Sequence, residues 1–86
     1  MKPTLRVLII EDSPDDAELA VRAVEHAGYA VHAGRVQTAE ELRGALTQAT
    51  WDLVLADYSL PHFSGTEGLA ILKETGLDIP FIVVSG

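Results

Sequence analysis

Acidic and hydroxyl side chains stand directly after three apolar segments of this sequence. They are Glu11 and Asp12 after residues 5–10, Asp57 after residues 53–56, and Ser85 after residues 81–84. In an open parallel sheet, ligands bind just outside the carboxyl ends of the strands, so these side chains are expected at one edge. Three carboxylates there repel one another unless they share a divalent cation or a proton. Mg²⁺ fits this set because it prefers oxygen ligands and is usually held by one or two carboxylates with waters and a phosphate.

Each of these residues also has an ordinary structural interpretation. Carboxylates after strands often solvate loops or cap helices, and for Glu11 or Asp12 taken alone this interpretation is the better one. A serine such as Ser85 can satisfy backbone groups where its strand ends. The combination with Asp57 at matching strand ends is what favours a functional site.

The apolar segments themselves predict strands. Residues 53–56 and 81–84, and residues 5–10 apart from Arg6, are apolar with little alternation, which is typical of parallel strands buried on both faces. Residues 29–36 alternate apolar and polar side chains and predict an edge strand. Trp51, just before the third apolar segment, is interpreted as a hydrophobic plug at the opposite end of the sheet.

Three helical stretches lie between the strands, and each opens with a Ser or Thr cap followed three residues later by an acid. The pairs are Ser13 with Asp16, Thr38 with Glu41, and Ser64 with Glu67. Apolar residues at helical spacing are expected to face the core. They are Leu19, Ala20, Ala23, Val24 and Ala27, then Ala39, Leu42, Ala45, Leu46 and Ala49, then Leu69, Ala70 and Leu72. The strict alternation of strand and helix predicts an α/β fold, a parallel sheet with right-handed crossovers.

Length and composition limit the possible functions. With 86 residues the chain is at most one domain, and 48% hydrophobic with 22% charged residues is ordinary for a globular protein. A net charge of −7 argues against binding nucleic acid or an anionic membrane and favours cations or basic protein surfaces. Its apolar runs are far shorter than the ~20 residues that span a bilayer. The sequence has no cysteine, so we expect no disulfide and no thiolate zinc site, and a reducing cytoplasm fits.

Three stretches together resemble the response-regulator receiver domain. They are Ile-Ile-Glu-Asp at 9–12, Asp-Tyr-Ser-Leu-Pro-His-Phe-Ser-Gly at 57–65, and Phe-Ile-Val-Val-Ser-Gly at 81–86. The acid pair, the Asp-x-x-Leu-Pro-x-x-Ser-Gly run and the Ser-Gly at these relative positions form a specific combination. The resemblance implies a flavodoxin-like doubly wound parallel sheet. Because the family has five strands and five helices, residues 1–86 are interpreted as a single partial receiver domain that lacks the last helix, strand and helix.

The resemblance also implies roles for individual residues. Asp57 would accept a phosphoryl group from a phosphohistidine on a sensor histidine kinase or phosphotransfer protein of a two-component or phosphorelay system. Asp12 and Asp57 would bind Mg²⁺ directly, with the backbone carbonyl of Ser59 as a further ligand and Glu11 acting through water. The Ser85 hydroxyl would bond the phosphoryl oxygens and move on activation. Such a domain is not an enzyme, beyond slow self-phosphorylation from small donors and self-dephosphorylation.

The chain departs from the family pattern at its end. It stops before the family's fifth-strand Lys and aromatic switch residue, so slow phosphotransfer is expected. The fourth strand would leave an unpaired edge, which is a template for pairing with another chain, and we expect self-association there.

Two other classes of function stay open. A Mg²⁺-dependent phosphatase of the haloacid-dehalogenase type also uses an Asp nucleophile after a strand, but it needs a second Asp two residues later, where this chain has Ser59. Its nucleophile also follows the first strand, not the third. The other class is a receiver remnant that binds partners without being phosphorylated, for which Asp57→Asn would change nothing.

Overall fold

Four parallel strands form the centre of the molecule. The computed structural model describes residues 2–57 and 65–84. Within them the strands are β1 (Thr4–Ile10), β2 (Ala30–Val36), β3 (Leu53–Asp57) and β4 (Phe81–Val84), and their order in the sheet is β2-β1-β3-β4. The sequence prediction of an α/β parallel sheet with residues 29–36 at an edge is therefore confirmed.

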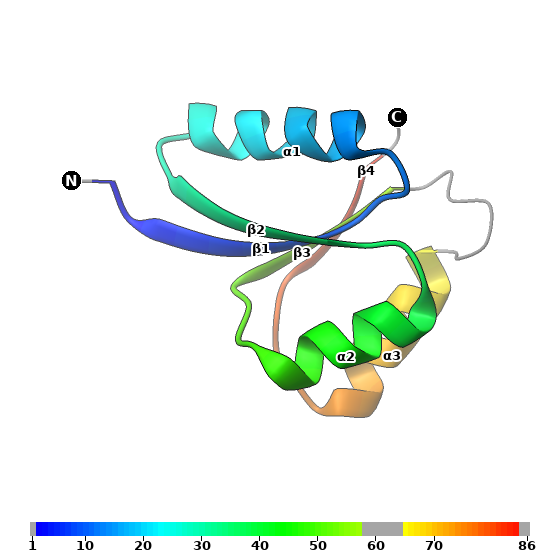
Figure 1. Cartoon of the computed structure of the whole chain (residues 1–86). Helices are drawn as coiled ribbons and strands as arrows, with labels where there is room; N and C mark the ends of the chain where they lie inside the picture. The colour runs from blue at the N-terminus through cyan, green and yellow to red at the C-terminus, as the bar shows by residue number, and fades with distance from the viewer. Residues whose placement is uncertain (1, 58–64, 85–86) are drawn as a thin grey trace.

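In the described part of the chain, three helices connect the strands and cover the two faces of the sheet unequally. They are α1 (Pro14–His26), α2 (Ala39–Gln48) and α3 (Gly65–Thr75). Figure 1 shows α1 on one face and the α2–α3 pair on the other. Among the described residues, no helix combines the length and apolar character needed to cross a bilayer.

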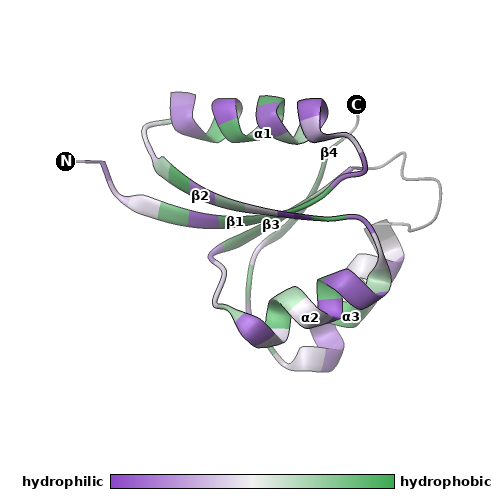
Figure 2. Cartoon of the chain, in the orientation of Figure 1, coloured by the Kyte–Doolittle hydropathy of each residue, from purple (hydrophilic) through white to green (hydrophobic). Residues whose placement is uncertain are grey.

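Two hydrophobic clusters, one on each face, explain why the last four residues of β1, residues 7–10, are all apolar. Leu8 and Ile10 point into the cluster under α2 and α3, whereas Val7 and Ile9 point into the cluster under α1. All four side chains are buried, because successive residues of a strand point to opposite faces and both faces of β1 are covered. Figure 2 shows this apolar centre against the more hydrophilic helix surfaces.

The helix caps form as predicted, but their reciprocal bonds differ from a standard capping box. Ser13 Oγ accepts from Asp16 N at 3.3 Å, and Thr38 Oγ1 accepts from Glu41 N at 3.1 Å. The Glu41 carboxylate accepts from Gln37 N, one residue before the cap. The predicted Ser64–Glu67 cap lies outside the described residues. Helices α1 and α3 end shortly before Gly28 and Gly76, whose φ angles of 106° and 73° suit glycine.

The predicted core stripes were partly wrong in all three helices. In α2, Leu42 and Leu46 are buried, but the predicted Ala49 is exposed because it lies at the C-cap, past the last helical residue. The side of α1 that packs on the sheet consists of Ala17, Ala20, Val21 and Val24. Three residues of the predicted stripe are exposed, namely Leu19, Ala23 and Ala27. In α3 the residues Ile71 and Leu72 are buried, and the predicted Leu69 and Ala70 are exposed. Helical spacing alone does not say how wide the covered stripe is, because that depends on which neighbours flank the helix.

The prediction that the fourth strand is buried on both faces was also wrong. Ile82, Val83 and Val84 are 44–49% exposed, whereas Phe81 packs against the cluster under α2 and α3. The reason is position: β4 is the outer strand next to β3, and no described element lies beyond it. Its composition is that of a central strand, but its place in the described sheet is an edge.

Candidate acidic site at the carboxyl edge of the sheet

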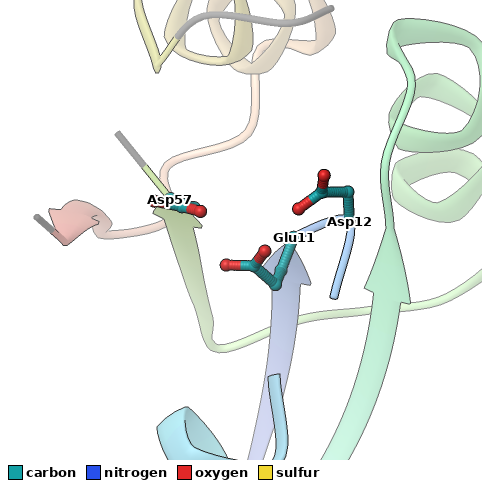
Figure 3. Close-up of side chains that lie close together, drawn as sticks. All are labelled: Glu11, Asp12 and Asp57. Atoms are coloured by element: carbon teal, nitrogen blue, oxygen red, sulfur yellow. The ribbon is translucent and has the colours of Figure 1, made fainter. Parts of the chain in front are cut away.

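Strand register brings the predicted acidic residues together. In the β1–β3 pair Ile10 lies opposite Ala56, so the next residues, Glu11 and Asp57, follow side by side. Figure 3 shows Glu11 at the end of β1, Asp57 at the end of β3 and Asp12 one residue further on, with their carboxylates turned toward a common space. One carboxylate oxygen from each of the three residues lies within 4.8 Å of the other two.

The three carboxylates differ in burial. Glu11 is only 6% exposed and is the buried charged residue among those described, whereas Asp12 is exposed and Asp57 is partly exposed. Glu11 is held in place by its own turn, because its Oε1 accepts from the backbone N–H of Ser13 at 3.1 Å. The site therefore has a buried oxygen donor at its base and more accessible donors above it.

The surroundings of the Glu11 carboxyl shift its pKa upward. Burial, the largest cause, and the neighbouring Asp12 and Asp57 side chains together raise the pKa of the Glu11 carboxyl from an ordinary 4.5 to about 7, although the hydrogen bond from the Ser13 N–H acts in the opposite direction. A bound cation would favour the ionised form of Glu11. In its absence, retaining a proton on Glu11 relieves part of the repulsion.

A basic side chain from β2 also reaches this edge. Arg35 Nη1 donates to the backbone carbonyl of Glu11 at 3.2 Å and to that of Asp12 at 3.4 Å. Arg35 was not among the site residues predicted from the sequence. Its place near the end of the segment predicted as an edge strand was the available signal, because the end of that strand shares the sheet edge with the acids.

A groove opens beside the acidic residues on the α1 face. It has a volume of about 380 Å³, with apolar walls that include Leu19, Leu55 and Val84. Glu11 and Asp57 also line it. Residues of α1 line one side of the groove, and residues at the ends of β1, β3 and β4 line the other. The groove gives a ligand access to Asp57 from the side.

The donor set suits a hard divalent cation. All three side chains offer carboxylate oxygens, and no nitrogen or sulfur ligand takes part among the described residues. Mg²⁺ is commonly held by one or two carboxylates, with waters completing its octahedral shell, so donors within 4.8 Å of one another fit direct and water-mediated contacts. The structure thus brings together Glu11, Asp12 and Asp57 as predicted. Ser59 and Ser85, the other two predicted site residues, lie outside the described residues.

Comparison with known proteins relates this edge to a family. The family model of the response regulator receiver domain matches residues 7–86. The sensor kinase CckA of Brucella abortus (strain 2308) is 35% identical over 85 residues, which cover 93% of this chain and 8% of CckA. The protein-glutamate methylesterase/protein-glutamine glutaminase of Treponema pallidum (strain Nichols) is 28% identical over 81 residues, covering 94% of this chain and 20% of that protein. The chain thus spans a small part of the length of these relatives.

A solved structure shows the same fold. Full-length FixJ from B. japonicum superposes with a TM-score of 0.73 at 19% sequence identity, over 92% of this chain and 38% of FixJ. At this identity the likeness concerns the arrangement of strands and helices alone. It agrees with the parallel sheet and the connecting helices described above.

Proposed function

The chain belongs to the response regulator receiver domain family, and on this premise we propose that it accepts a phosphoryl group on Asp57 in two-component or phosphorelay signalling, with Mg²⁺ bound at the acidic cluster. The observation that carries the proposal is the convergence of the Glu11, Asp12 and Asp57 carboxylates within 4.8 Å at the carboxyl edge of the sheet. A surface acid with only a solvating role does not need two further acids beside it, one of them buried.

The chemistry assigned to Asp57 is nucleophilic. One of its carboxylate oxygens attacks the phosphorus of a phosphohistidine, the bond between phosphorus and the imidazole nitrogen breaks, and its electron pair returns to that nitrogen. Asp57 is suited to this role because it ends β3 at the mouth of the groove and is partly exposed, so a donor can approach it. Asp12, with Asp57, would contact the metal directly, and the buried Glu11 would act through water.

The metal supplies charge neutralisation for the phosphoryl group during transfer. The protein's part is to hold the oxygen donors in place. Two further roles are proposed from the family resemblance: the Ser59 carbonyl as a metal ligand and the Ser85 hydroxyl as a hydrogen-bond donor to the phosphoryl oxygens.

The proposed partner is a sensor histidine kinase or a phosphotransfer protein, which fits the similarity to a sensor kinase. The net charge of −7 favours a partner with a basic surface over nucleic acid or an anionic membrane. A cytoplasmic location is proposed because phosphohistidine donors in such relays are formed from ATP.

Intact mass after incubation with a small-molecule phosphodonor and Mg²⁺ tests the proposal. The wild-type chain is expected to gain one phosphate, and the gain is expected to disappear in Asp57→Asn and in a chelator control. Asp78→Asn is the matched control, because it removes an exposed carboxylate that is not part of the cluster. A gain that survives Asp57→Asn would place the modification elsewhere. No gain in a chain shown to be folded would favour a passive interaction module.

A further inference from the structure

We propose that Arg35 is a positioning residue of the acidic site, acting through the backbone of Glu11 and Asp12. This inference rests on the proposed function, since it assigns Arg35 a part in metal binding. Arg35 is the penultimate residue of β2 and lies opposite Ile9 of β1. Its guanidinium is therefore carried to the turn that follows β1, where both acids begin.

Two hydrogen bonds connect this one side chain to the acidic turn. Arg35 Nη1 donates to Glu11 O at 3.2 Å and to Asp12 O at 3.4 Å. A backbone bond from Glu11 N to Val36 O at 2.9 Å extends the β1–β2 pairing by one residue. After that bond the chain leaves the sheet, so the orientation of the Asp12 peptide depends on side-chain contacts. Arg35 is the side chain from β2 that provides them.

The contact of Arg35 with the turn is compatible with metal binding because its acceptors are backbone carbonyl oxygens. Arg35 bonds carbonyl oxygens of the turn, so these bonds do not occupy the carboxylate oxygens of Glu11 and Asp12 that would bind a cation. A guanidinium paired with the carboxylates themselves would compete with Mg²⁺. Partners in the outer shell that orient metal ligands typically change metal affinity by about 10- to 100-fold when they are removed.

Arg35 could affect Mg²⁺ binding by electrostatic repulsion or by positioning the turn. These two effects predict opposite changes in Mg²⁺ affinity when Arg35 is removed. If Arg35 acted only as a nearby positive charge, removing it would strengthen Mg²⁺ binding, because two cations repel. If it positions the turn, removing it weakens Mg²⁺ binding, because the Asp12 carboxylate loses its fixed direction.

Calorimetric titration of the full chain with Mg²⁺ decides between these cases. We expect Arg35→Gln to raise the Kd for Mg²⁺ by about tenfold. Arg35→Lys is expected to fall between wild type and Arg35→Gln, because Lys keeps the charge and can reach only part of the two-carbonyl contact. Arg43→Gln is the matched control and should bind like wild type, since Arg43 is exposed on α2 and pairs with Glu74 at 3.6 Å.

Urea denaturation without metal accompanies the titration and establishes that each variant is folded. Should Arg35→Gln fail to fold, the comparison of Arg35→Lys with wild type decides, because a Lys variant that binds as tightly as wild type would overturn the positioning role. Equal or tighter binding by a folded Arg35→Gln would overturn it too, while leaving the proposed function intact. Absence of Mg²⁺ binding by the wild-type chain would contradict the proposed function itself, and the role of Arg35 with it.

Discussion

Trp51 lies directly against Gly34, so that a Cβ atom at position 34 would be 2.6 Å from Cη2 of the indole ring. The ring packs against the cluster under α2 and α3, and its Nε1 donates to the Ala45 carbonyl at 2.9 Å. Trp51 thus joins the edge strand β2 to helix α2. The sequence interpretation of Trp51 as a plug agrees with this contact.

Gly34→Ala is expected to destabilise the fold by about 1–3 kcal/mol, the usual cost of overpacking. The indole ring cannot move away without weakening its bond to Ala45. Urea denaturation measures the effect. Gly44→Ala is the matched control, because a Cβ at position 44 meets nothing within 4 Å and Ala is favoured over Gly within a helix by about 1 kcal/mol. Equal stability of the Gly34→Ala variant and wild type would show that the ring shifts freely.

Mg²⁺ binding is expected to strengthen as the pH rises toward and through about 7, because the buried Glu11 carboxyl must lose its proton to serve a cation. Below that pKa the affinity should fall by up to about tenfold per pH unit where binding requires the ionised carboxylate. Titration in buffers of different ionisation enthalpy measures the proton released. Glu11→Gln should abolish the release, and an unchanged release in that variant would assign the proton to another group.

The metal-free chain should show the opposite trend in stability. Because the folded-state pKa of Glu11 is raised from 4.5 to about 7, its contribution is fully present below pH 4.5 and is lost as the pH rises through about 7. Glu11→Gln should remove this loss and be more stable than wild type above pH 7. Thermal unfolding in a chelating buffer across this range measures it. A wild-type chain and variant with parallel pH profiles would contradict the assignment.

Asp57→Asn is expected to stabilise the metal-free chain by on the order of 1 kcal/mol, because one of three neighbouring negative charges is removed. The wild-type chain should instead gain about 2.7 kcal/mol at a hundredfold excess of Mg²⁺ over its Kd, and the variant should gain far less. Thermal unfolding with and without Mg²⁺ tests both statements, with Asp78→Asn as control. An equal metal-induced gain in Asp57→Asn would remove Asp57 from the metal site.

Self-association through β4 is expected because Ile82, Val83 and Val84 are 44–49% exposed on an edge strand. Sedimentation velocity over a range of concentrations should show a shift to larger species. Ile82→Lys should reduce it, since a charge on an edge strand opposes pairing. A wild-type chain that stays a folded monomer at every concentration would contradict the prediction.

Local patterns in the sequence were enough to predict the strands, the starts of two helices and the acidic site. The apolar runs placed the strands, the Ser13 and Thr38 caps placed the starts of α1 and α2, and the acids after the strands indicated the site. These features depend on residues a few positions apart, and the preference of each type for a strand, a cap or a turn acts within that distance.

Only the tertiary structure decided the rest. The strand order β2-β1-β3-β4 places Glu11 beside Asp57, buries Glu11 and carries Arg35 to the acidic turn. The same packing seats Trp51 on Gly34, leaves Leu19 outside the core and makes β4 an edge despite its apolar composition. The physical reason is that burial, register and pKa depend on contacts between segments that lie tens of residues apart, which a local pattern does not contain.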